Sequence, residues 1–306
     1  MKASDIMNFM GLRTYSAILS LLMLAISIGS LTFNQLQLGL DFTGGALVEV
    51  SYSSPVSLND IRDTLARSGF PDAVVQTFGT PTEVLIRLAT THTPSLGDEV
   101  VQALRMGTEQ SIKLLRAEYV GAQVGEDLRE QGGLGMLLAL GGVMLYVALR
   151  FQIKFAVGAV VALLHDVLIV LGVFSVFKLE FDLTVLAAIL AVIGYSLNDS
   201  LVVADRIREN FRKLRTETPL TIINRSLTET LGRTLMTSIT TLLVLVALFI
   251  FGGTLIHCFA TALLVGVTVG TYSSIYVASS LLLWMDIKSE DLIGSPEKDA
   301  EMDDRP

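Results

Sequence analysis

Six stretches of the chain are apolar and long enough to cross a lipid bilayer, and no other feature constrains the fold as much. A membrane-spanning helix needs roughly 20 predominantly apolar residues. The composition agrees, because 51% of the 306 residues are hydrophobic and only 17% are charged, whereas about 25% are charged in a typical soluble protein. We therefore predict a polytopic α-helical membrane protein with six transmembrane helices. The expected segments are Tyr15–Phe33, Gly132–Ala148, Phe155–Phe177, Leu183–Ala204, Thr234–Phe251 and Phe259–Met285.

The positions of lysine and arginine predict how these helices are oriented. Loops rich in these residues stay on the cytoplasmic side of a membrane. The segment 205–233 is rich in arginine, whereas residues 252–257 contain no lysine or arginine. We therefore expect both chain ends in the cytoplasm and one large domain on the outer side. The predicted divisions are a cytoplasmic N-terminus at 1–14, the first helix at 15–33, the outer domain at 34–131, the other five helices at 132–285 and an acidic cytoplasmic tail at 286–306.

The outer region alternates between patterns typical of strands and of helices. Ala46–Tyr52 alternates as a half-buried strand does, and a capping-box-like start at Ser57 opens a helix. The order strand, helix, strand, strand, helix, strand predicts an α+β ferredoxin-like domain with two helices on one sheet face. The other face or an edge would be free to bind something or to pack on a partner domain, and the pattern leaves both open. The remaining expected elements are strands at Val74–Phe78, Glu83–Leu88 and Ile112–Val120 and a helix at Leu96–Met106.

Asp199 is the candidate functional residue of the fourth apolar segment. An aspartate at the centre of a spanning helix costs roughly 2.5 to 3.5 kcal/mol to insert, and toward the inner third, where Asp199 falls, the cost is lower but still real. Ser196 lies one helical turn before it on the same face, with Asn198 and Ser200 on either side. This polar cluster predicts a lined pathway in which Asp199 relays protons. The alternative is a hydrogen bond that joins two helices of the bundle.

Arg233 and Asp166 are two further candidates for a proton relay. Arg233 and Thr237 recur at helical spacing, so they form part of a polar stripe that we expect to face Asp199. An arginine at a helix end can instead extend to lipid headgroups. Asp166 follows His165 near the middle of the third segment. That pair fits either a second relay step or hydrogen bonds that hold the bundle together.

The sequence has no pattern typical of a bound nucleotide, metal or disulfide. Cys258 is the only cysteine, the three histidines are far apart, and no G-x-x-x-x-G-K-[ST] motif occurs. The net charge of −8 argues against nucleic acid as a partner. We therefore expect no enzymatic activity and no cofactor other than protons. Work done by such a chain must be driven by a gradient or by a partner.

A glycine-rich segment joins the first apolar segment to the outer region. Gly44 and Gly45 are adjacent glycines, which let a backbone turn sharply and pack closely. Gly39 precedes them, and Asp41 has a carboxylate that can accept backbone N–H groups at the turn. The segment fits a hinge that transmits helix movement or a rigid structural turn, and the sequence leaves this open.

Four motifs in a fixed order make the chain similar to the SecF family. Ala122 stands where that family usually has proline, and Ala204 where close relatives often have serine, but neither position is ionisable. The motifs are Gly39–Gly45 after the first apolar segment, Val120–Gly125 before the second, Ile193–Ser200 running into Asp205–Asn210, and Arg233-Thr234 opening the fifth.

The resemblance implies a half-transporter of the resistance-nodulation-division superfamily in the bacterial inner membrane, with its large loop in the periplasm. The partner SecD would supply a related set of six helices. Together they would use the proton-motive force to promote late-stage export of unfolded preproteins from the SecYEG channel, with YajC and YidC as further partners. The family places functional residues at Asp199 and Arg233. The alternative is a proton-coupled exporter of small molecules or lipids from the same superfamily.

Overall fold

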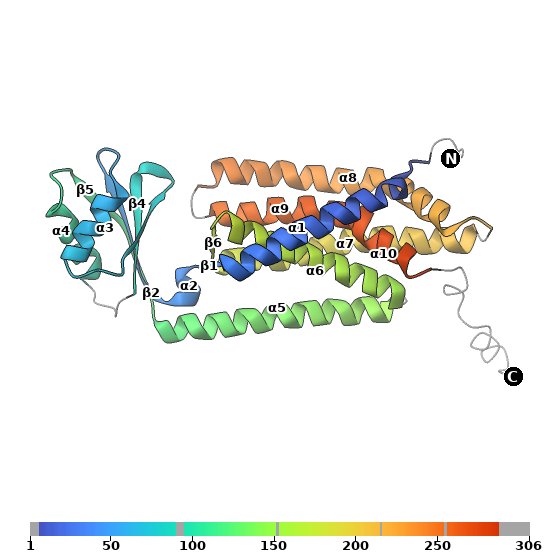
Figure 1. Ribbon diagram of the computed structural model, residues 1–306, viewed down its shortest axis with the longest axis horizontal. Coiled ribbons are helices and arrows are strands. Elements are labelled where there is room, and N and C mark those ends of the chain that lie inside the picture. The colour runs from blue at the N-terminus through green and yellow to red at the C-terminus, as the bar shows by residue number, and fades with distance from the viewer. Residues whose placement is uncertain (1–5, 90–94, 151–152, 215, 254–255, 288–306) are drawn as a thin grey trace.

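The computed structural model describes residues 6–89, 95–150, 153–214, 216–253 and 256–287. Within these ranges, six helices are long and apolar enough to cross a membrane, as predicted. They form a bundle, and the outer domain lies beyond one end of it (Figure 1). The predicted acidic tail lies outside the described residues from position 288 onward.

Three spanning helices are clearly longer than the apolar segments that predicted them, and the first of these, α5 (Ala122–Arg150), begins inside the predicted outer domain and not at Gly132. Helix α7 covers Leu183–Lys213 and α8 covers Pro219–Phe251, so both continue for several turns into the arginine-rich region. Arginine, lysine and glutamate are good helix formers, which explains why a helix continues where the apolar pattern ends. The other bundle elements are the short helix η2 (Phe9–Leu12), α1 (Arg13–Phe33), α6 (Ile153–Val176), and a last span made of α9 (His257–Ser273), the π-helix η4 (Ser274–Ala278) and α10 (Ser279–Trp284).

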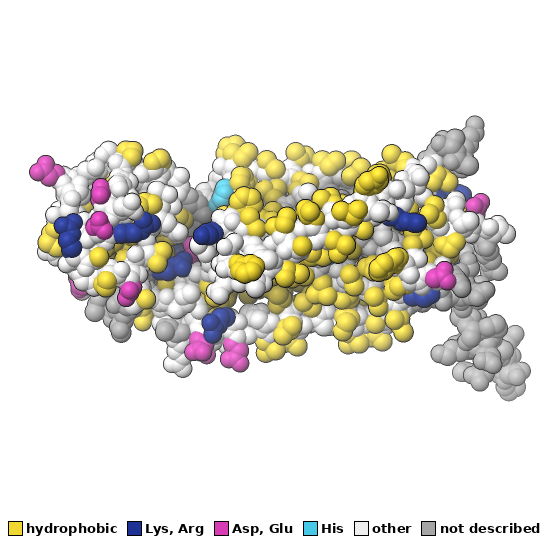
Figure 2. All heavy atoms as spheres, viewed as in Figure 1, with side chains coloured by type: hydrophobic (Ala, Val, Ile, Leu, Met, Phe, Trp, Pro, Cys, Tyr) yellow, Lys and Arg dark blue, Asp and Glu magenta, His cyan; other side chains and the backbone are white. Residues whose placement is uncertain are grey.

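The bundle surface is apolar, as a surface in contact with lipid must be. Figure 2 shows hydrophobic side chains over most of the bundle, whereas charged side chains gather on the outer domain and at the opposite end of the bundle. Helix α6 is the most buried span and α5 is the least buried. The functional carboxylates predicted from the sequence lie on α6 and α7, inside this apolar envelope.

The outer domain is a four-stranded antiparallel sheet with two helices. The strand order is β3-β4-β2-β5, and each neighbouring pair is antiparallel. Val48, Val50 and Ile86 are fully buried on the face that packs against the helices. On the other face, Leu47 and Leu85 pack against Leu40 of the junction with the bundle. The elements are β2 (Gly45–Tyr52), α3 (Leu58–Arg67), β3 (Val74–Phe78), β4 (Thr80–Leu88), α4 (Leu96–Arg105) and β5 (Ile112–Val120).

A small junction connects the outer domain to the bundle. Strand β1 (Gln37–Leu38) pairs in parallel with β6 (Glu180–Phe181), and the one-turn helix α2 (Leu40–Thr43) follows β1. The Gly39 amide donates to the Phe181 carbonyl at 2.8 Å. The segment after α1 is thereby attached to the turn between α6 and α7. These two-residue strands are too short to leave a pattern in the sequence, and we did not predict them.

Candidate functional site

Asp199 is buried in the bundle between three helices. Its side chain on α7 is only 6% exposed. Thr234 of α8 donates a hydrogen bond to Oδ1 at 2.9 Å, and Ser274 of η4 donates one to Oδ2 at 2.6 Å. Each carboxylate oxygen therefore has one hydroxyl partner, and each partner comes from a different helix.

Asp166 forms a second buried carboxylate centre on α6. It is fully buried, and both Ser196 and Ser273 donate to its Oδ2 atom, at 2.5 and 2.7 Å. The Nδ1 atom of His165 lies 3.0 Å from its Oδ1 atom. The two centres are therefore built alike, with hydroxyl groups as the main partners of each carboxylate.

Consecutive serines connect the two centres. Ser273 ends α9 and bonds Asp166, whereas Ser274 begins the π-helix η4 and bonds Asp199. Single π-turns inside α-helices occur frequently at functional sites. On α7, Ser196 and Asp199 lie one turn apart, so this helix also carries one member of each centre. The two carboxylates therefore share their supporting helices.

A glycine allows the close packing of α9 on these carboxylates. A Cβ atom on Gly270 would lie 3.1 Å from Cβ of Ser196 and 3.5 Å from Oδ2 of Asp166. The first of these distances is shorter than an ordinary carbon–carbon contact. Gly270 is thus part of the wall around Asp166, and a larger residue there would displace the serine that bonds it.

The predicted pairing of Arg233 with Asp199 is not found in the described structure. Arg233 is exposed, and among the described residues it contacts no carboxylate. Successive helix positions differ by about 100° in direction, so Thr234 occupies the inward position that we assigned to its neighbour. Thr237 is likewise exposed, and its hydroxyl bonds carbonyls of its own helix.

The other predicted residues of the polar face differ in their positions. Ser196 belongs to the site, but its hydroxyl donates to Asp166 and not to Asp199 as predicted. Asn198 is exposed, because it is one residue away from the inward face, and Ser200 is buried. The sequence does not reveal Ser273 and Ser274 as hydroxyl partners, because two serines in a small-residue helix face are also common in helix packing.

The glycine-rich junction is held by specific contacts to the start of α7. The Leu183 amide donates to Oδ2 of Asp41 at 3.1 Å. Gly44 and Gly45 have φ angles of 66° and 111°, a region that favours glycine. A Cβ atom on Gly45 would also lie 2.5 Å from the carbonyl oxygen of Leu88. The two glycines are thus required by the backbone here.

An ion pair joins the outer domain to the same junction. Arg87 of β4 bonds Glu180 of β6 at 2.5 Å and donates to the Leu38 carbonyl at 2.8 Å. Burial raises the pKa of the Glu180 carboxyl above its ordinary value, Arg87 lowers it by a smaller amount, and Asp182 and Asp41 raise it further. Burial outweighs the ion pair, so the junction is sensitive to the protonation of Glu180.

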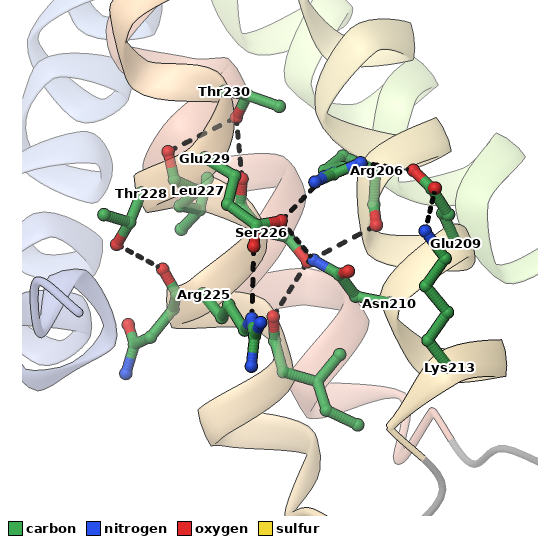
Figure 3. A network of polar contacts seen from close by, with 12 residues as sticks. Arg206, Glu209, Asn210, Lys213, Arg225, Ser226, Leu227, Thr228, Glu229 and Thr230 are labelled. Atoms are coloured by element: carbon green, nitrogen blue, oxygen red, sulfur yellow. Dashed lines mark hydrogen bonds and ion pairs between the residues drawn. The ribbon is translucent and has the colours of Figure 1, made fainter. Parts of the chain in front are cut away.

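A polar network holds α7 and α8 together at the opposite end of the bundle. The carboxylate of Glu229 accepts hydrogen bonds from Arg206 at 2.7 Å, Asn210 at 2.8 Å and Arg225 at 3.1 Å (Figure 3). The helices that carry Asp199 and Thr234 are thereby fixed to each other outside the apolar region. This network stabilises the parts of both helices that extend beyond the predicted segments.

Comparison with known proteins identifies the family. A model described as protein export membrane protein SecD/SecF, C-terminal, matches residues 100–288, and the SecD/SecF GG motif matches residues 29–56. The protein translocase subunit SecF of Pseudomonas aeruginosa is 51% identical over 300 residues, which cover 98% of this chain and 97% of that protein. The chain belongs to the SecF family. SecF of Vibrio alginolyticus is 50% identical over 311 residues, covering 100% of this chain and 99% of that protein.

Longer SecDF proteins contain a region similar to most of this chain. SecDF of Thermus thermophilus is 41% identical over 284 residues, covering 90% of this chain and 38% of that protein. A crystal structure of Thermus SecDF, described as a translocon-associated membrane protein, matches with a TM-score of 0.85 at 38% identity, covering 94% of this chain and 40% of that one. The GG motif of the SecF family corresponds to the junction described above. As a member of this family, the chain is an accessory membrane subunit of the Sec protein translocase.

Proposed function

We propose that the chain works with SecD and uses the proton-motive force to promote late-stage export of preproteins across the bacterial inner membrane. The observation that carries this proposal is the pair of buried carboxylates, Asp199 and Asp166, inside a bundle of spanning helices. Buried ionisable groups in spanning helices are costly and mark proton relays in many pumps. No separate catalytic activity is needed for this role.

The partners of the carboxylates suit a change of protonation. A hydroxyl group can donate or accept a hydrogen bond, so Thr234 and Ser274 can bond Asp199 in either of its protonation states. Ser196 and Ser273 can do the same for Asp166. The hydrogen bonding of the site is therefore maintained while the charge changes. We propose that protons pass through these two carboxylates, with His165 as an additional donor or acceptor beside Asp166.

The junction provides a mechanical route from the relay to the outer domain. Asp199 lies on α7, and the first residue of α7, Leu183, is bonded to Asp41. The outer domain reaches the same point through Arg87 and Glu180. A displacement of α7 would therefore be transmitted to the outer domain, with the adjacent glycines as the hinge.

Two exposed polar residues on the spanning helices are a reason to expect that the helices of a partner cover this face of the bundle. Arg233 and Asn198 are exposed on α8 and α7, two helices long and apolar enough to cross a membrane, where contact with lipid would be unfavourable. We propose that helices of SecD cover this face and that Arg233 acts on the relay from there. SecYEG would deliver the preprotein, and YajC and YidC would be neighbours in the same assembly.

The outer domain is proposed to lie in the periplasm, with both chain ends in the cytoplasm. Its element order and its strand order β3-β4-β2-β5 support assignment to the ferredoxin-like class. There it would contact the emerging preprotein. One charge that crosses about 100 mV supplies about 2.3 kcal/mol, which is enough to bias the movement of an unfolded chain but not to unfold a stable domain.

The experiment compares two aspartates of α7 in inverted membrane vesicles that contain the intact partner. Asp199→Asn should abolish the stimulation of precursor transport by an imposed proton-motive force while ATP-driven transport remains. Asp205→Asn is the matched control, because Asp205 is exposed on the same helix, and it should leave the stimulation intact. Persistent stimulation in Asp199→Asn, with normal assembly of the complex, would refute the relay.

A further inference from the structure

A groove lies between α1 and α6 at the end of the bundle remote from the outer domain. Nearer the domain the two helices touch, since Ser30 and Ser175 share a hydrogen bond of 2.8 Å and Gly172 packs directly on Ser27. Toward the other end they separate, and α10 lies between them (Figure 1). The space left has a volume of about 710 Å³, which is within the range of roughly 300 to 1,000 Å³ of ligand pockets.

The groove is apolar and open on the side that faces lipid. Leu21 and Leu164 in its walls are 66% and 43% exposed. The hydroxyl groups of Ser16 and Ser20 line it as well, but they already bond the Arg13 carbonyl and the Tyr272 hydroxyl. The walls therefore require an apolar occupant. The main apolar lining residues are Leu21, Leu24, Val161, Leu164, Leu168 and Leu281.

The end of the groove farthest from the outer domain has groups suited to a lipid headgroup. Arg13 is exposed and has no ion pair among the described residues, and Trp284 is 90% exposed. Tryptophan is enriched at membrane–water interfaces, and the arginine guanidinium matches the geometry of a phosphate. Both residues line the same groove. We therefore expect the phosphate of a lipid headgroup, and the membrane–water interface, at this end of the groove.

The length of the groove matches one leaflet of a bilayer. It follows α1 from Arg13 to Leu24, which is about 16 Å at 1.5 Å per residue. The apolar half of a bilayer is about 15 Å thick. A transmembrane helix of a partner is about 10 to 12 Å wide and would have to continue past the contact of Ser27 with Gly172, where the groove closes. The dimensions thus favour a lipid over a helix.

We propose that this groove binds one phospholipid, with the phosphate at Arg13 and an acyl chain between α1 and α6. The lipid fills a wedge beside His165, which belongs both to the groove wall and to the Asp166 centre. The bound chain therefore supports the helix that carries the second carboxylate. This inference is independent of the direction and source of proton movement.

The test measures phospholipid that co-purifies with the intact complex from a bacterial lipid mixture, by native mass spectrometry. Ala17→Phe places a ring in the groove, whereas Ile18→Phe adds the same ring to the neighbouring exposed position, which does not line it. Bound phospholipid should fall roughly tenfold in Ala17→Phe and remain unchanged in Ile18→Phe. Equal retention in the two variants would overturn the proposal.

A second pair of variants tests the headgroup. Arg13→Gln should lower phospholipid retention roughly tenfold, as expected for the loss of a charged hydrogen bond. Arg212→Gln removes another exposed arginine and should have no effect. If Arg13→Gln retains as much lipid as Arg212→Gln, the phosphate assignment is wrong. If Ala17→Cys cross-links to a partner helix and no lipid is bound, the groove is a protein interface and the proposal fails.

Discussion

Removal of Arg87 should loosen the junction between the outer domain and the bundle. In Arg87→Met the ion pair with Glu180 and the hydrogen bond to the Leu38 carbonyl are both lost. Hydrogen bonds that involve a charged group contribute about 1.5 to 3 kcal/mol each. The Arg87 and Glu180 side chains are 22% and 27% exposed, so solvent reduces this contribution. We expect a net loss of about 2 kcal/mol, or roughly a 30-fold larger open population.

Hydrogen exchange at the junction measures this change directly. The Gly39 and Leu183 amides are bonded to Phe181 and Asp41 across the junction, and they exchange when it opens. Their exchange should become roughly 30-fold faster. Arg62→Met is the control, because Arg62 bonds groups within the outer domain only.

The same variant should show a defined pH dependence. Burial raises the pKa of Glu180 above its ordinary value of 4.5, so its contribution to stability is complete below that value and is lost as pH rises through the raised value. Without Arg87, ionised Glu180 has no compensating charge at the junction. The opening caused by Arg87→Met should therefore be smaller in mild acid than at neutral pH, after correction for intrinsic exchange rates. Unchanged exchange, or equal acceleration in Arg62→Met, would refute this reasoning.

Two further predictions concern a glycine and a threonine. Gly45→Ala should destabilise the full chain by about 3 kcal/mol or more, because it combines backbone strain of roughly 1 to 3 kcal/mol with a clash against the Leu88 carbonyl. The control Gly69→Ala, at a position with a φ of 97° and open space around it, should cost the backbone strain alone. Equal melting temperatures of the two variants in detergent would contradict this prediction. Thr234→Val should lower the free energy of unfolding by about 1 to 3 kcal/mol, since it leaves a buried oxygen of Asp199 without its donor. Thr240→Val, at an exposed position of the same helix, should be nearly neutral in the same thermal unfolding assay, and a larger loss in Thr240→Val than in Thr234→Val would show that the Thr234 hydroxyl is dispensable.

The outer domain and the six spans could be predicted because their patterns are strong. Ala46–Tyr52 alternates with period two, and β2 occupies Gly45–Tyr52. The turn at Gly79 has a φ of 73°, which matches its place between two predicted strands. In the bundle, Asp199 stands out because a carboxylate in an apolar run has few explanations. Strong local signals of this kind do not depend on knowledge of the neighbouring helices.

The direction of each polar side chain in the bundle could not be predicted in the same way. A helix in lipid is apolar on all sides, so its sequence has little periodicity to define the buried face. One residue of error in phase turns a side chain by about 100°, which is the difference between Arg233 and Thr234. The β1–β6 pair was missed for a different reason, because two residues cannot express a repeat.

The neighbouring positions of Ser273 and Ser274 have a consequence for how the two carboxylate centres are coupled. Each serine serves one carboxylate, and both belong to the same turn of the last span. A rotation of this turn would remove a donor from Asp166 and from Asp199 in a single movement. A structural change at one centre would therefore reach the other through the last span, so the two centres would rearrange together and not independently.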